Sequence, residues 1–192
     1  MISYRVGAAG RHMALNGLAI LAAVSALGHP LERAVAQLDS FAALPGRGEE
    51  IDLSLGGRRL KVIDDAYNAN PGSMRAALER LNGHEGGKRR IAVLGEMAEL
   101  GPGAAAYHTE LATIIQGSSI DQVFVTGELY TDFWDALSPA RRGFHADSRQ
   151  ALKEILRDQL ADGDVVLFKG SHSTGMHELV AWLKKSADGS AA

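Results

Sequence analysis

The chain has 192 residues, a mass of 20.4 kDa and no cysteine. The lack of cysteine excludes disulfide scaffolds, thiolate metal sites and cysteine nucleophiles, and it fits a reducing, cytoplasmic compartment. Twenty Lys and Arg against 23 Asp and Glu give a formal net charge of −3, which is too balanced for a protein that binds nucleic acid by neutralising phosphates. Because the length exceeds that of a typical domain of ~100–150 residues, we expect one domain with an extension, or two small domains.

The first part of the chain predicts a short strand followed by two helices. Apolar residues recur at near-helical spacing in residues 14–27 and again in residues 31–41. The first run is too often interrupted by polar residues to cross a bilayer, and no secretory signal precedes it, so we expect a buried helix and no membrane partner. The Pro- and Gly-containing segment 44–48 breaks the pattern. It places the predicted domain boundary between residues 1–45 and 46–192.

Strands and helices alternate after this boundary. Short apolar runs that end in Gly or Asp are typical of strands buried on both faces, as in parallel sheets. They predict strands at 59–65, 90–95, 121–127 and 164–170, with a weaker one at 143–146. Helical patterns separate them; in one, Asn70 is the expected N-cap, Pro71 the first residue and Gly83 the stop. The alternation predicts an α/β fold with an open, doubly wound, mostly parallel, Rossmann-like sheet preceded by helices.

Polar side chains follow the first of these predicted strands. Ligands of open α/β sheets bind where strands end and helices begin. Asp64 and Asp65 close the strand, and Tyr67, Asn68 and Asn70 come before the helix. A carboxylate there can accept hydrogen bonds from a sugar diol, and the amides can recognise amide or carboxylate groups. The alternative is that Asp64 and Asn70 only cap the turn and the helix.

Two further segments fall at strand ends. Glu96, directly after the strand at 90–95, could face the same crevice, whereas we expect His108 to face solvent or pack rather than catalyse. Lys169, followed by Ser171 and a Gly/Ser/Thr turn, forms a plausible anion cradle of charge, hydroxyls and backbone N–H groups. The alternative is a capped helix with an exposed lysine. The segment is not a Walker A loop, since the GxxxxGK[ST] order is absent.

A fourth polar motif lies at the start of the helix predicted in residues 14–27. His12 and Asn16 are four residues apart and therefore share one helical face. An asparagine inside an apolar helix is unfavourable unless its amide is paired. We therefore expect an adenine-type partner or a buried internal hydrogen bond for Asn16.

These motifs together resemble those of the Mur ligase family, in the expected order and spacing. They are GRHMALN at 10–16, DDAYNANPGSM at 64–74, GEMAELG at 95–101 and KGSHSTGM at 169–176. The resemblance covers essentially the whole chain. It implies that residues 1–45 are the tail of the family's central, ATP-binding domain and that residues 46–192 are its C-terminal domain. The family's N-terminal domain, its GK[ST] loop, its magnesium-binding Glu and His and its modified lysine do not occur in this sequence.

The resemblance also implies an activity. Its nearest form within the family is a ligase that uses ATP and Mg²⁺ to phosphorylate the carboxylate of UDP-N-acetylmuramoyl-tripeptide; the amine of D-alanyl-D-alanine then attacks the acyl phosphate. This chain alone is then expected to be inactive, with no catalytic residue, no metal ligand and no tightly bound cofactor. The alternatives are another Mur or folylpolyglutamate-type amide ligase, a non-catalytic nucleotide-binding module, and a structural fragment.

Roles for individual residues follow from the resemblance as well. On the ATP side it implies His12, Asn16, Arg47 and Asp65. On the dipeptide side we expect Tyr67, Asn68, Asn70, Lys169 and Ser171, with Lys169 and the helix start after Ser171 attracting the dipeptide carboxylate. Met13 departs from the asparagine that is common in the wider family, so only one amide contact, that of Asn16, carries over.

Overall fold

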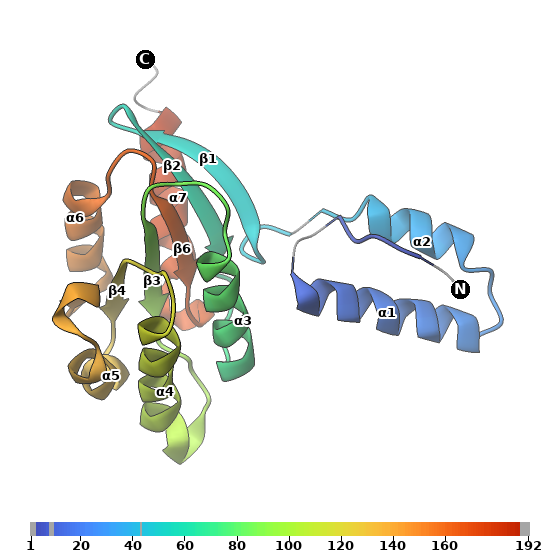
Figure 1. The fold of residues 1–192 in the computed structure, drawn as a ribbon, viewed down its shortest axis with the longest axis horizontal. Coiled ribbons are helices and arrows are strands. Elements are labelled where there is room, and N and C mark those ends of the chain that lie inside the picture. The colour runs from blue at the N-terminus through green and yellow to red at the C-terminus, as the bar shows by residue number, and fades with distance from the viewer. Residues whose placement is uncertain (1–2, 8–9, 43, 189–192) are drawn as a thin grey trace. The chain divides into compact units, whose positions relative to one another are not determined.

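The computed structural model describes residues 3–7, 10–42 and 44–188 (Figure 1). The chain divides into two compact units, Met1–Leu44 and Pro45–Ala192. No helix in the described ranges is long and apolar enough to cross a membrane.

The first unit consists of two helices, as expected, but lacks the predicted strand. Helix α1 spans Arg11–Ala26 and α2 spans Glu32–Asp39. Residues 3–7 form no strand because no neighbouring strand among the described residues of this unit can share its backbone hydrogen bonds. Gly7 N–H donates instead to Leu38 O, at 2.9 Å.

The prediction that residues 14–27 form a buried helix is wrong. Leu15, Leu18 and Ile20 are about half exposed, and Leu27 is 74% exposed. The small unit covers one side of α1 around Gly17, where an added Cβ would touch Val6, Tyr4 and Leu38. Helical periodicity thus identified the helix correctly, but periodicity does not show how much of the apolar surface the chain itself covers.

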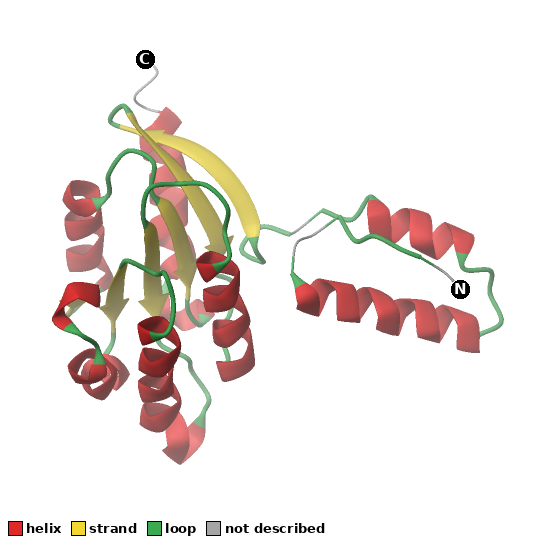
Figure 2. Cartoon of the chain, in the orientation of Figure 1, coloured by secondary structure: helices red, strands yellow, loops and turns green. Residues whose placement is uncertain are grey.

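The second unit is built on a six-stranded sheet (Figure 2). The strand order is β1-β2-β6-β3-β4-β5, and every neighbouring pair is parallel except β1 and β2. The strands are β1 Glu49–Leu55, β2 Arg58–Asp65, β3 Arg90–Gly95, β4 Gln122–Thr126, β5 Arg142–Ala146 and β6 Val165–Lys169. The predicted open, mostly parallel α/β sheet is confirmed.

Strand β1 was not predicted. It pairs with β2 through a turn at Gly56 and Gly57, whose φ angles of 55° and 79° suit the tight turn of a hairpin. The alternation of Ile51, Leu53 and Leu55 with polar residues, followed by Gly-Gly, is the signal that could have identified it.

Helices cover both faces of this sheet (Figure 1). The cores beneath them are separate: one lies under α3, α4 and α5 and the other under α6 and α7. The helices are α3 Pro71–Asn82, α4 Ala104–Gln116, α5 Thr131–Ala136, α6 Arg149–Gln159 and α7 Met176–Asp188. Right-handed crossovers through α3, α4 and α5 connect β2 to β3, β3 to β4 and β4 to β5 along one face of the sheet. Helix α6 then connects β5 to β6 along the other face. Strand β6 therefore enters between β2 and β3, so the ends of these three strands are neighbours.

The start of α3 forms as its sequence predicts. The Asn70 side chain accepts a hydrogen bond from Ser73 N–H at 2.8 Å, and Asn70 N–H donates to Ser73 Oγ at 3.0 Å. This reciprocal pair is a capping box. Pro71 occupies the first position and Gly83 follows the last turn. The position of the loop before α3 is thus fixed by local interactions.

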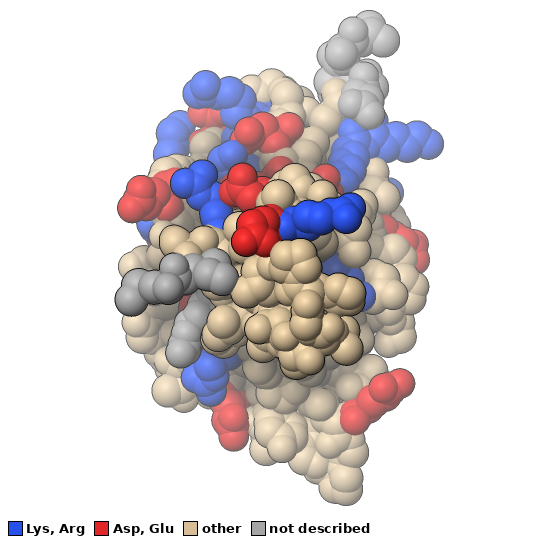
Figure 3. Space-filling view, turned by 90° about the vertical axis from the view of Figure 1, so that its right-hand side faces the viewer, with Lys and Arg blue, Asp and Glu red and all other residues tan. Residues whose placement is uncertain are grey.

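The surface carries both signs of charge. On the face drawn in Figure 3, Lys and Arg lie among Asp and Glu and form no large patch of one sign. Elsewhere in the described structure, too, opposite charges pair, as Lys61 does with Asp52 at 2.7 Å and Lys88 with Asp162 at 3.0 Å. This arrangement agrees with the balanced composition.

Candidate functional site

Three loops meet at the carboxyl edge of the sheet, following β2, β3 and β6. Ser171 N–H donates to Glu96 O at 2.9 Å, and Ser171 Oγ accepts from Ala98 N–H at 2.8 Å. The same hydroxyl lies 3.5 Å from Ala69 O. Ser171 is 3% exposed, so its polar groups bond within the protein. The three motifs at strand ends that the sequence singled out therefore come together.

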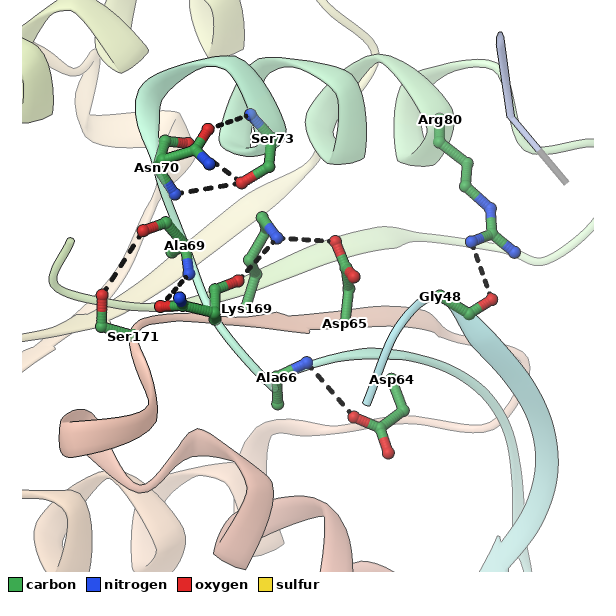
Figure 4. A network of polar contacts seen from close by, with 11 residues as sticks. Gly48, Asp64, Asp65, Ala66, Ala69, Asn70, Ser73, Arg80, Lys169 and Ser171 are labelled. Atoms are coloured by element: carbon green, nitrogen blue, oxygen red, sulfur yellow. Dashed lines mark hydrogen bonds and ion pairs between the residues drawn. The ribbon is translucent and has the colours of Figure 1, made fainter. Parts of the chain in front are cut away.

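Lys169 is the buried charge of this edge (Figure 4). Its Nζ donates to Asp65 Oδ2 at 2.7 Å and to Asn68 O at 3.0 Å. The lysine side chain is 2% exposed and that of Asp65 is 26% exposed. The alternative of an exposed lysine is therefore wrong: burying an unpaired ammonium is costly, and the carboxylate 104 residues away in the chain offsets this cost.

The two neighbouring aspartates differ in environment. Asp64 is 5% exposed, and its Oδ1 accepts from Ala66 N–H at 3.3 Å. Burial raises the pKa of the Asp64 carboxyl, while the bond from Ala66 and the nearby charge of Lys184, at 4.0 Å, oppose this rise. The Asp64 side chain thus closes the turn after β2. Asp65 Oδ1, in contrast, has no hydrogen-bond partner within the described part of the chain.

An exposed ring lies beside this pair of aspartates. Tyr67 is 47% exposed, and the Arg47 guanidinium carbon lies 4.1 Å from the centre of its ring. His172 lies 5.9 Å from Tyr67 between ring centres, and His177 stacks on His172 at 4.4 Å with the planes parallel within 1°. Sequence reasoning missed both histidines. Their signal is the KGSHSTGMH segment, in which two histidines flank the turn into α7.

Asn68 and Asn70 are exposed on the same loop, and both use their side-chain oxygen within the chain. Asn68 Oδ1 accepts from Ala69 N–H at 2.9 Å, and Asn70 Oδ1 accepts from Ser73 N–H. The structure thus shows the capping contact for Asn70, and it leaves the exposed NH₂ groups at the surface of the loop.

The loop after β3 is held by buried groups. Glu96 Oε1 accepts from Leu129 N–H at 2.8 Å, and Tyr130 OH donates to Gly95 O at 3.0 Å. His108 is fully buried: its Nε2 accepts from Met97 N–H at 2.9 Å, and its Nδ1 lies 2.7 Å from Ala104 O. Both ring nitrogens therefore have backbone partners in this loop and in α4. His108 packs, as expected, and supports the loop.

Two predicted site residues, His12 and Asn16, belong to the first unit. Asn16 lies on α1 and is exposed, so the alternative of a buried internal hydrogen bond for its amide is wrong, for the same reason that α1 is not buried, and the adenine-type partner stays a prediction. His12 is in α1 as well, but its side chain lies outside the described residues. Arg47 and Asp65 are placed in the second unit.

Acidic and histidine side chains do not gather into a metal centre in the portion of the chain that is described. Residues 3–7, 10–42 and 44–188 contain no group of three or more His, Asp or Glu positioned to hold an ion. The site instead offers one partly free carboxylate, an exposed guanidinium on an aromatic ring, and exposed amides.

Comparison with known proteins identifies this arrangement. The profile of the family described as "Mur ligase, glutamate ligase domain" matches residues 46–172. This chain is 33% identical to the UDP-N-acetylmuramoyl-tripeptide--D-alanyl-D-alanine ligase of Bacillus subtilis and 35% identical to that of Escherichia coli, in each case over 92% of its length. The chain spans only about two fifths of the length of these relatives, 39% and 38%.

Solved structures show the same similarity. MurF from Acinetobacter baumannii matches 95% of this chain with a TM-score of 0.79 and 29% identity, and the chain covers 39% of it. The MurF ligase of Thermotoga maritima, in complex with ADP, matches 94% of this chain with a TM-score of 0.74 and 26% identity, and the chain covers 40% of it. The family profile, the sequence relatives and the fold agree, and the chain therefore belongs to the Mur ligase family.

Proposed function

We propose that this chain is the C-terminal portion of a ligase that joins D-alanyl-D-alanine to UDP-N-acetylmuramoyl-tripeptide in cytoplasmic peptidoglycan precursor synthesis. The observation that carries the proposal is the similarity to ligases of this name over 92% of the chain. In the proposed division, residues 46–192 are the C-terminal domain and residues 1–45 are the tail of a central, ATP-binding domain.

The exposed leucines of α1 support this division. A small unit with Leu15, Leu18 and Leu27 largely exposed leaves more apolar surface in water than a separate domain normally does. A larger domain that continues from this unit would cover the helix. The relatives are long enough to supply one, since this chain accounts for about two fifths of their length.

The proposed nucleotide-binding residues of the second unit are Asp65 and Arg47, and those of the first unit are His12 and Asn16. The free Oδ1 of Asp65 can accept a hydrogen bond from a ribose hydroxyl, and the exposed Arg47 guanidinium can pair with a phosphate. The ADP bound to the Thermotoga relative supports a nucleotide here. ATP, with Mg²⁺ held by the proposed missing domains, would supply the phosphoryl group that activates the tripeptide carboxylate.

The proposed dipeptide side consists of Tyr67, Asn68, Asn70, Lys169 and Ser171. Lys169 has three donors and uses two of them within the chain. Its side chain is 2% exposed, so in this proposal the third N–H binds the carboxylate of a dipeptide once the neighbouring loops admit it. The exposed amides of Asn68 and Asn70 can donate to the same substrate. The Ser171 hydroxyl, which bonds with Ala98, holds the loops around them.

The gene provides the first test. Sequencing the reading frame upstream of the Met1 codon is expected to show an in-frame GK[ST] loop. The complete product is then expected to release phosphate only when ATP, UDP-N-acetylmuramoyl-tripeptide and D-alanyl-D-alanine are all present. A frame without this loop, with no such release from its product, contradicts the proposal.

Binding to the 192-residue chain alone separates the proposal from a nucleotide-binding module. We expect isothermal titration with ATP and with D-alanyl-D-alanine to show no tight binding, because the GK[ST] loop and the magnesium-binding residues that the family uses do not occur in this sequence. Tight ATP binding by this chain favours a non-catalytic module.

The family description favours a second candidate, a ligase that adds glutamate. A screen of amino acids and dipeptides with the complete enzyme distinguishes the two, since activity with glutamate and none with D-alanyl-D-alanine contradicts the first proposal.

Lys169 tests the assignment of the dipeptide side. In the complete enzyme, Lys169→Ala is expected to raise the KM for D-alanyl-D-alanine more than the KM for ATP. The partly buried Lys153, which lies over Trp182 at 5.3 Å, provides a control through Lys153→Ala, for which neither KM changes. The reverse ranking for Lys169→Ala refutes the assignment.

A further inference from the structure

The segment that carries Arg47 is fixed to the second unit by its own backbone. Tyr67 N–H donates to Gly46 O at 2.9 Å, and Gly48 N–H donates to Asp64 O at 2.7 Å. Gly46 and Gly48 have φ angles of 74° and 84°, which favour glycine. Arg47 thus lies between two anchored residues, so the direction in which its side chain leaves the backbone is set.

Arg80 of α3 adds a side-chain anchor to this segment (Figure 4). Its Nη1 donates to Gly48 O at 2.8 Å and its Nη2 donates to Glu50 Oε1 at 2.8 Å. An added Cβ on Gly48 would come within 2.6 Å of Arg80 Nη1, so the guanidinium occupies space that only glycine leaves open. The Arg80 side chain is only 17% exposed.

Arg80 forms an ion pair with Glu50. Burial alone would raise the pKa of the Glu50 carboxyl, but the hydrogen bond and charge of Arg80, together with His84, hold it below its ordinary value. His84 Nε2 lies 3.6 Å from the other Glu50 oxygen. Glu50 therefore stays ionised at neutral pH and keeps its bond to the planar guanidinium fork, which fixes geometry better than a lysine would.

We infer that Arg80 is a positioning residue for Arg47: by holding Gly48 and Glu50 it presets the Arg47 guanidinium over the face of Tyr67. An unrestrained arginine loses much side-chain entropy when it binds a ligand, and a preset one loses less. The inference rests on the proposed function, in which Arg47 faces the nucleotide. Arg80 touches no substrate in this arrangement and acts only through Arg47.

The first experiment reads the Arg47–Tyr67 contact directly in the 192-residue chain. Protons of Arg47 over the Tyr67 ring, with Cζ 4.1 Å from its centre, are shifted upfield in the NMR spectrum by the ring current. We expect Arg80→Ala to remove most of this shift and Arg80→Lys to remove part of it. Arg75→Ala, an exposed arginine of the same helix, is the matched control and leaves the shift unchanged.

The fold is monitored in the same spectra through the indole signals of Trp134 and Trp182. A full Arg47 shift in a folded Arg80→Ala variant overturns the inference. Should Arg80→Ala fail to fold, Arg80→Lys decides: the compact ammonium cannot donate to Gly48 O and Glu50 in the fixed fork geometry, so an unchanged shift overturns the inference in that variant too.

The second experiment measures ATP affinity in the complete ligase and tests whether Arg80 acts through Arg47. In a double-mutant cycle, we expect Arg80→Ala to weaken ATP binding several-fold when Arg47 is present and to have almost no effect in the Arg47→Ala background. Equal losses in both backgrounds contradict positioning. If the NMR shift is lost while ATP affinity stays unchanged in every variant, the positioning holds and the proposed nucleotide role of Arg47 fails.

Discussion

The two units of the chain use similar apolar side chains in opposite ways. Leu78 and Leu81 of α3 are fully buried between the helix and the sheet, whereas Leu15 and Leu18 of α1 are more than half exposed. The α/β unit buries its apolar residues on both faces of its sheet. The second unit therefore covers its own apolar surface, whereas the described part of the first unit leaves much of the apolar surface of α1 in water.

Separating the two units is expected to have the largest effect. Only Leu21 and Leu38 are buried apolar residues in the described part of the first unit, too few to offset the entropy of ordering it. We expect residues 1–44 alone to lose most of their helix, as measured by far-UV circular dichroism. Residues 45–192 alone should keep the urea midpoint of the full chain, followed through Trp134 and Trp182, both of which lie in this unit. A cooperative thermal transition of the 1–44 peptide would falsify the contrast.

A matched pair of leucine substitutions tests the difference in burial between α3 and α1. Leu78→Ala is expected to lower the free energy of unfolding by about 2–5 kcal/mol, because it removes a fully buried side chain and leaves a cavity. Leu18→Ala, at an exposed position of α1, should change it by no more than about 0.5 kcal/mol. Urea titration followed by tryptophan fluorescence measures the first, and circular dichroism adds the second. Similar losses for both variants contradict the assigned burial.

A smaller effect is expected at the cap that sets the site loop. Asn70→Ala removes the acceptor for Ser73 N–H and should cost the second unit about 1 kcal/mol in urea unfolding. Asn70→Ser retains an acceptor of the kind preferred at this position and serves as the control. If alanine and serine are equally stable, the capping box does not stabilise α3.

The smallest effect depends on pH. The N–H of Arg59 and the ammonium of Lys88 lower the pKa of Asp162 from 3.8 to about 2. Since the folded pKa lies below the unfolded one, the stabilisation is present above about pH 4 and is lost as pH falls towards 2. With Asp162→Asn, the urea midpoint should fall less between about pH 4 and pH 2 than it does in the unsubstituted chain. Near neutral pH, the dependence of the midpoint on pH should be the same in both. An acid profile identical to that of the unsubstituted chain would show that Asp162 is not the group responsible.

The parts of the fold that sequence could predict are those set by local interactions. Residues that are close together in the sequence determine the Asn70 cap, the end of α3 at Gly83 and the buried strands. Strand β1 was missed although its apolar and polar residues alternate, and α5 has only six residues, too few for a periodic pattern to define its bounds.

Long-range features of the site could not be predicted in the same way. Lys169 could be placed at a strand end, but its bond to Asp65 depends on β6 lying beside β2, which no local pattern encodes. The anchoring of Gly48 by Arg80, 32 residues away, has the same origin. The exposure of Asn16 depends on how much of α1 the first unit covers, which lies beyond helical periodicity altogether.

The placement of β6 has a consequence for how this unit is synthesised. The strand that fills the middle of the sheet is the last to leave the ribosome, after β2, β3, β4 and β5 have all been made. Until then β2 and β3 have no partner on the sides they later share with it, and such unpaired edges invite association with other chains. A premature stop before Val165 would therefore yield an aggregation-prone product rather than a slightly shorter protein, and nascent chains of this length are natural clients for chaperones.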